Sequence, residues 1–227
     1  MDAPHPILHN RSMTTSTELK NRHRQVRDNQ LPGMALRIHR AISWLARAEQ
    51  ESNDPDTQFI HCWIALNAAY AKEFGFEERE LEQISQFIVK LVEHDHEQKL
   101  QQLLFNQFSG PIRTLIDNKF TYEPFWRALR QHDASNTWEP EFRKSREVAM
   151  RGILDGRTHH TLQVVLERLY VLRNQLIHGG STHNGRVNRA QIHDGARILS
   201  ALVPTIVGLM IEMEDLDLGE CIYPVVG

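Results

Sequence analysis

The sequence predicts an all-α fold, in which antiparallel helices pack as a bundle. Several long segments place apolar residues three and four positions apart, as one face of a helix requires. No segment alternates apolar and polar residues for long enough to indicate a strand. Glycine and proline separate the apolar segments at short intervals, which favours neighbouring helices joined by turns.

The composition is typical of a globular protein in solution, with 41% hydrophobic and 24% charged residues in a chain of 227. The net charge of -3 argues against nucleic acid or membrane covering the whole surface. Cys62 and Cys221 are far apart and are expected to be reduced thiols. The longest apolar run, 198–211, is too short to span a membrane, and no signal peptide is evident, so we expect a cytoplasmic protein.

The N-terminal half predicts an extension followed by helices. Residues 1–32 are polar and aperiodic and are expected to form a flexible extension, whereas 33–218 form the helical domain and 219–227 a tail. Helical spacing begins at Met34. The sequence NDPD, 53–56, predicts the end of one helix and the N-cap of the next. Aromatic residues at helical spacing in this half are expected to lie in the core: Trp44, Trp63 and Tyr70.

The region 106–157 differs from the rest because glycine and proline interrupt it repeatedly. We expect a set of short helices inserted as a cap between two parts of the bundle. A helix is predicted over 160–177, followed by a glycine-rich loop and a long final helix over 188–213. The interrupting residues are Gly110, Pro111, Pro124, Pro140, Gly152 and Gly156.

Arg173 has an unexpected position on the helix predicted over 160–177. With Leu162 at zero and 100° per residue, the leucines of the apolar stripe fall between about 280° and about 40°, and Arg173 falls at about 20°. Glu167 and Arg168 fall outside the stripe, where we expect contact with solvent. Burying an unpaired guanidinium costs several kcal/mol. Arg173 therefore pairs with an internal carboxylate, faces a second protein chain, or lines a site for an anion.

The residues around Arg173 form the pattern Arg173-Asn174-x3-His178, followed by two glycines that end the helix. This pattern resembles the signature of the HEPN superfamily (higher eukaryotes and prokaryotes nucleotide-binding), which are small helical bundles. That signature is an arginine, often directly followed by a polar residue, then four to six intervening residues in all, and then a histidine at the end of a helix. The segment 59–71, FIHCWIALNAAYA, also looks like the second helix of several prokaryotic HEPN families.

The resemblance covers 34–74 and 160–213 and leaves 106–157 unmatched. A second Arg-x4-His pattern, Arg127 to His132, has alanine after the arginine and lies in the interrupted region without a long apolar lead-in. We therefore expect the second pattern to be unrelated to function.

The resemblance implies a metal-independent endoribonuclease that acts as a homodimer on RNA, without a cofactor. Arg173 would bind the phosphate, His178 would act as acid or base, and Asn174 would orient one of them. Two motif copies in one dimeric cleft would supply both histidines. The resemblance also suggests a toxin or antiviral defence role and an antitoxin or inhibitory protein as partner. Toxins paired with a nucleotidyltransferase often carry tyrosine two residues after the histidine, where this chain has Gly180.

Other functions stay open from the sequence. A non-catalytic HEPN-like dimer could bind nucleotide, RNA or a partner protein, and an unrelated structural bundle would pair Arg173 with an internal acid. The 13 histidines do not show the spacing of a metal site, because His94 and His96 diverge on a helix. Asn67 could hydrogen-bond near the motif.

Overall fold

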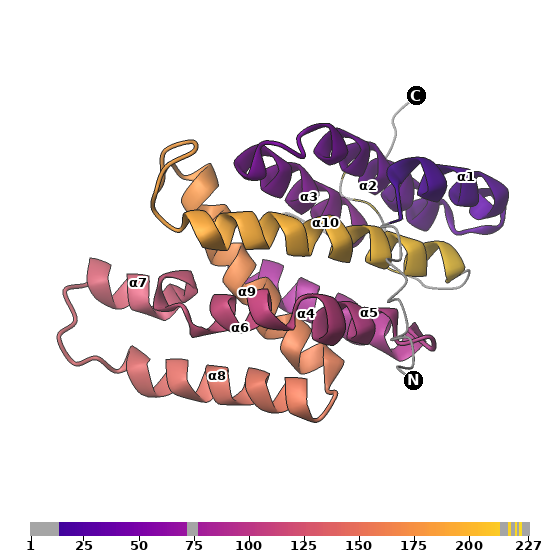
Figure 1. Cartoon of the computed structure of the whole chain (residues 1–227). Coiled ribbons are helices and arrows are strands. Elements are labelled where there is room, and N and C mark those ends of the chain that lie inside the picture. The colour runs from indigo at the N-terminus through magenta and orange to yellow at the C-terminus, as the bar shows by residue number, and fades with distance from the viewer. Residues whose placement is uncertain (1–13, 72–76, 214–217, 219–220, 222, 224–227) are drawn as a thin grey trace, which may run out of the picture.

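The computed structural model describes residues 14–71, 77–213, 218, 221 and 223, and within these residues the chain is all-helical, as predicted, without a strand (Figure 1). The helices and helical turns follow one another in this order: α1 (Ser16–Val26), η1 (Arg27–Asn29), α2 (Pro32–Gln50), α3 (Pro55–Tyr70), α4 (Glu77–His94), α5 (Lys99–Gln102), η2 (Leu103–Gln107), α6 (Ser109–Asp117), η3 (Lys119–Thr121), α7 (Glu123–Arg130), α8 (Trp138–Leu154), α9 (Thr158–Ile177) and α10 (Arg189–Glu212).

The helices form two groups that meet along α9. The helices α1, α2, α3 and α10 pack against one another, and α5, α6, α7 and α8 lie on the other side (Figure 1). Helix α9 runs obliquely between the groups and contacts α3 and α10 as well as α4, α6 and α8. Its C-terminal end, which carries the Arg-Asn-His motif, therefore reaches the start of α3 and α10.

The helix α10 is the most completely buried helix near the motif. Its glycine at 195 allows close packing, because a Cβ there would lie 2.8 Å from the Phe59 ring and 3.0 Å from Leu169. The sequence predicted this helix over 188–213, and Asn188 and Met213 are its two capping residues. It is long and apolar enough to cross a membrane, but 78% of its most apolar window is buried inside the bundle, the pattern of a core helix in a soluble protein.

The N-terminal extension predicted over 1–32 is partly wrong. Residues 16–26 form α1, which begins at a capping box: the Thr15 hydroxyl accepts from the Glu18 amide, and the Glu18 carboxylate accepts from the Thr15 amide at 2.9 Å. Leu19 is fully buried. The sequence TSTE contains this capping signal, but one buried leucine in a polar segment gives little periodicity. Residues 1–13 lie outside the described residues.

The inserted region is helical, but α8 is longer than the short helices expected there. Pro140 is the third residue of α8, where a missing amide hydrogen costs no helical hydrogen bond, and Gly152 is near its end. The short break that the sequence FGFEERE (74–80) also indicates is wrong at 77–80, where α4 has already begun, and 74–76 lie outside the described residues. Most of the predicted tail, 219–227, also lies outside them.

The placement of Arg168 on a solvent-exposed face was wrong. Its side chain is 1% exposed because η3 and α8 cover the second face of α9. The guanidinium lies 4.4 Å from the centre of the Tyr122 ring and 5.2 Å from that of Phe142, and it donates to the Ser145 hydroxyl at 3.1 Å. The inserted region thus packs directly on the helix that carries the motif.

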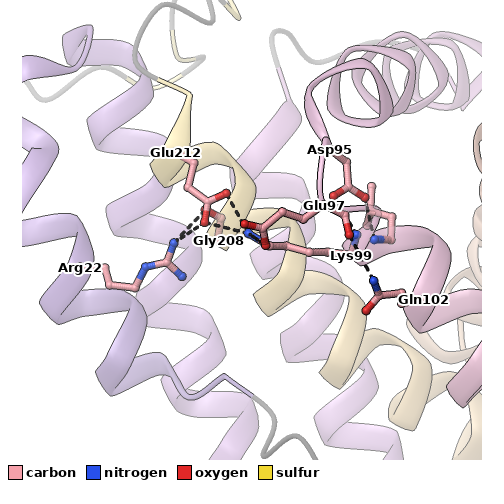
Figure 2. A network of polar contacts seen from close by, with 8 residues as sticks. Arg22, Asp95, Glu97, Lys99, Gln102, Gly208 and Glu212 are labelled. Atoms are coloured by element: carbon pink, nitrogen blue, oxygen red, sulfur yellow. Dashed lines mark hydrogen bonds and ion pairs between the residues drawn. The ribbon is translucent and has the colours of Figure 1, made fainter.

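A network of charged side chains connects α1, α5 and α10 at the end of α10 that is distant from the motif. Figure 2 shows Glu212, from the last turn of α10, between Arg22 of α1 at 2.7 Å and Lys99 of α5 at 2.9 Å. Arg22 and Lys99 both line a cavity of about 370 Å³. Because both cations are paired with Glu212, and Lys99 also with Glu97, this network accounts for the packing of three helices rather than for a ligand.

Candidate active site

The candidate site lies where α9 ends. The last helical residue is Ile177, and His178 is the C-cap, in agreement with the predicted helix end. Gly179 has a φ of 69°, a left-handed conformation that favours glycine. The Gly180 amide donates to the Gln175 carbonyl at 2.8 Å, and the Gly179 amide to the Leu176 carbonyl at 3.4 Å. These two hydrogen bonds form a Schellman motif, which turns the chain sharply after His178.

Arg173 is half-buried one turn before this end. Its Nη1 donates to the Asn174 Oδ1 at 2.8 Å, and its guanidinium lies 5.5 Å from the centre of the Tyr170 ring. Its Nε is buried and has no hydrogen-bond acceptor. No carboxylate among the described residues forms an ion pair with it. The internal ion pair that the sequence left open is therefore not formed within the described part of the chain.

Within one chain, two of the three motif residues contact each other and the third does not. Asn174 contacts Arg173 and holds one edge of the guanidinium. The His178 side chain is exposed and forms no hydrogen bond with another described residue. One chain thus presents a partly desolvated cation and a solvent-accessible imidazole near the same helix end, without joining the two side chains.

Gln175 is a residue of this site that sequence reasoning missed. Its Nε2 donates to the Phe120 carbonyl at 2.9 Å, and its Oε1 accepts from the Asn188 side chain at 2.8 Å. It therefore links the inserted region, the last turn of α9 and the start of α10. Its only sequence signal is its position inside the motif, because a half-exposed glutamine near a helix end is otherwise ordinary.

The loop after His178 is tied to the N-terminus of α3. His183 Nε2 lies 3.1 Å from Asp54 Oδ2, and the Asn184 amide donates to Asp56 Oδ2 at 3.1 Å. Arg189, from the first turn of α10, forms an ion pair with Asp56. We call these contacts the loop latch. They hold the middle of the loop that follows the candidate histidine and the start of α10 against the start of α3.

Asp54 is also the N-cap of α3, as the NDPD sequence predicted. Its carboxylate accepts from the Thr57 hydroxyl at 2.6 Å and from the amides of Asp56 and Thr57. The hydrogen bond from the Thr57 hydroxyl is the largest cause that lowers the pKa of Asp54 to about 2; the Thr57 amide and His183 lower it further. The carboxylate is therefore ionised at neutral pH, and its charge stabilises both the helix start and the latch.

Three residues of the latch are also the described residues best placed to hold a metal ion. Asp54, Asp56 and His183 each offer a ligand atom, and these atoms lie within 4.8 Å of one another. The Arg189 guanidinium contacts Asp56 Oδ2, and His183 contacts Asp54 Oδ2. These contacts engage the same groups in hydrogen bonds, so the cluster is explained as a latch.

The second Arg-x4-His pattern has a different environment. Arg127 lies on α7 and forms an ion pair with Glu123 at 2.7 Å, and both Arg127 and His132 are exposed. Its cation is thus neutralised by a neighbour one turn away. This contrast with Arg173 makes the second pattern a matched control for the first.

The other residues singled out from the sequence lie elsewhere in the fold. Trp63 and Tyr70 are buried, as predicted, but Trp44 is 39% exposed and stacks on His61, so its assignment to the core was wrong. Asn67 accepts from the Tyr70 hydroxyl at 2.8 Å, a contact within α3. Cys62 and Cys221 are free, as expected, and burial raises the pKa of Cys62 to about 11, which keeps its thiol protonated.

The motif is thus described by its geometry: a half-buried guanidinium held by Asn174, an exposed imidazole at a Schellman turn, and a latched loop. Comparisons of the chain with protein-family models, with curated proteins and with solved structures found no match.

Proposed function

We propose that this protein is a metal-independent endoribonuclease of the HEPN type that cleaves RNA at a site shared by two protomers. One observation carries the proposal: Arg173 is half-buried, lacks a carboxylate partner among the described residues and has an Nε without an acceptor. Because a desolvated guanidinium is costly without an anion, its position favours a ligand such as a phosphate. The exposed His178 at the same helix end supplies an imidazole that can act as acid or base.

The reaction that fits these groups is attack by the RNA's own 2′-hydroxyl. His178 of one protomer takes the 2′-hydroxyl proton while O2′ forms a bond to phosphorus. The bond from phosphorus to O5′ breaks, and protonated His178 of the second protomer gives its proton to that oxygen. The products are a 2′,3′-cyclic phosphate and a 5′-hydroxyl. Two histidines are needed because one is a base while the other is an acid.

Arg173 stabilises the negative charge that gathers on the phosphate oxygens during the attack. Its donors form a rigid fork that suits two of these oxygens, and the Asn174 oxygen fixes the orientation of that fork. Asn174 is therefore a positioning residue in this mechanism. A toxin or phage-defence role, with an inhibitory protein as partner, is part of the same proposal and rests on the family resemblance alone.

The test compares wild type with Arg173→Ala and His178→Ala on labelled RNA. We expect each variant to lose about 10²-fold to 10⁴-fold in cleavage rate while its circular dichroism stays helical. Arg127→Ala and His132→Ala, which change the second Arg-x4-His pattern, should cleave like wild type. The product ends should be 2′,3′-cyclic phosphates, and EDTA should not inhibit.

Three outcomes would contradict the proposal. Full activity in His178→Ala would remove the assigned acid and base, and inhibition by EDTA would indicate a different mechanism. A wild-type protein that binds RNA but does not cleave it, and whose expression is harmless to cells, would favour the non-catalytic HEPN-like scaffold instead.

A further inference from the structure

An aromatic surface lies on the inserted region, outside the proposed catalytic groups. It consists of Phe120, Phe125, Trp126 and Trp138, together with Lys119, and we call it the aromatic surface. Ring centres are 5.4 Å apart for Phe120 and Phe125 and 5.1 Å apart for Phe125 and Trp138. Phe120 is 41% exposed, and the other three rings are partly exposed. Several aromatic rings that contact one another and stay open to solvent form an exposed apolar patch, which indicates a ligand surface.

A lysine places a positive charge over two of these rings. Lys119 Nζ lies 5.4 Å from the centre of the Phe120 ring and 5.3 Å from that of Phe125. The segment 119–157 holds eight Lys or Arg and six Asp or Glu, a net charge of +2 in a chain whose total is -3. Arg143 and Lys144, exposed on α8, form no ion pair with another described residue. The ligand of this surface is therefore expected to be both flat and anionic.

The aromatic surface is joined to the motif through hydrogen bonds. The Phe120 carbonyl accepts from the Trp126 indole at 2.8 Å and from the Gln175 side chain at 2.9 Å. Gln175 precedes His178 by three residues, which is less than one helical turn and about 4.5 Å along the axis. Figure 1 shows α7 on the same side of the molecule as the C-terminal end of α9.

We propose that the aromatic surface stacks the unpaired bases of single-stranded RNA on one side of the cleaved linkage. This inference rests on the proposed function and names its substrate class. Stacked bases in a duplex do not offer their faces, whereas unpaired bases stack on aromatic side chains while lysine contacts the phosphates. The hydrogen bonds through Gln175 fix the spacing between the stacked bases and the phosphate bound by Arg173.

The test measures RNA binding in the full-length His178→Ala protein, so that cleavage does not interfere. The probe is a fluorescent 12-nucleotide oligouridine, followed by anisotropy. Phe120→Ala in this background should weaken binding about fivefold to tenfold, because it removes one stacking platform. Lys119→Ala should lower the slope of log affinity against log salt by about 0.7, as expected for one lost phosphate contact.

Leu154→Ala is the matched control for removing an exposed apolar side chain. Leu154 is 77% exposed at the end of α8, beside the start of α9, and the motif lies about 30 Å away along the 20 residues of that helix. This variant should bind the oligouridine like the parent protein. A 12-base-pair RNA duplex should bind parent and Phe120→Ala with equal affinity.

Unchanged oligouridine binding in both Phe120→Ala and Lys119→Ala would overturn the inference. A loss of dimers in Phe120→Ala, at equal RNA affinity per protomer, would also overturn it and would make the surface a protein interface. The result is separable from the proposed function. If wild type does not cleave RNA but Phe120→Ala weakens binding, the surface assignment stands and the nuclease fails; the reverse pattern removes only the surface.

Discussion

Two arginines of α9, five residues apart, meet opposite environments. Arg168 is 1% exposed and lies against the rings of Tyr122 and Phe142, with one hydrogen bond to Ser145. Burial lowers the pKa of Arg168 to about 10, so it remains charged at neutral pH. Arg173 is less buried and has one polar side-chain contact, with Asn174. The more buried cation is thus enclosed by protein rings, and the less buried one has no carboxylate partner among the described residues.

The enclosure of Arg168 allows a test at the level of one side chain. Arg168→Met should change the free energy of unfolding by less than about 1 kcal/mol, because the lost cation-π contacts are offset by the desolvation cost that the charge no longer imposes. Arg168→Ala should lose about 3 kcal/mol, because it leaves a cavity between two helices. Urea unfolding measures both. If Arg168→Met is as unstable as Arg168→Ala, the charge itself holds the inserted region on α9.

At the scale of the elements, the latch determines where the loop after His178 lies. Asp54 begins α3 and, through His183, also holds this loop, while Asp56 contacts both Asn184 and Arg189. The start of α3, the loop at 183–184 and the start of α10 are therefore held together by two carboxylates. Loss of either carboxylate changes a helix end and the surroundings of the candidate histidine together.

The latch gives stability a defined pH dependence. The folded pKa of Asp54 is about 2, below its ordinary value of 3.8, so its stabilisation is complete above about pH 4 and is lost as pH falls toward 2. Asp54→Asn keeps a capping oxygen but removes the charge. We expect this variant to be about 1 kcal/mol less stable than wild type at pH 6. Thermal unfolding should show the difference shrinking between pH 4 and pH 2; a constant difference would assign the effect to geometry.

The sequence predicted the helices and their ends better than it predicted the contacts between distant helices. The end of α9 at His178 and the start of α3 after Asp54 follow from local signals, a Gly-Gly pair and an Asp-Pro cap. The burial of Arg168 could not be predicted from one apolar stripe, because a second layer of helices covers the other face of α9. The loop latch could not be predicted either, because it joins residues distant in the sequence: Asp54 and His183 are 129 residues apart.

At the scale of the whole molecule, the proposal requires two chains. A single chain presents one Arg173 and one exposed His178, whereas the reaction needs an acid and a base. Ile177 and Val187, on either side of His178 in the sequence, are 49% and 64% exposed. In the proposed dimer, these exposed apolar side chains would supply contact area for the symmetric partner.

A shared site predicts how activity depends on subunit composition. Wild-type chains and chains carrying both Arg173→Ala and His178→Ala would be co-expressed with different tags, and their proportions measured. If both motifs of a dimer act on one linkage, only wild-type pairs are active, and an equal random mixture keeps about a quarter of wild-type activity. Independent sites would keep about half. Because the two values differ twofold, a titration of the mixture distinguishes them, and a linear dependence on the wild-type fraction would contradict the shared site.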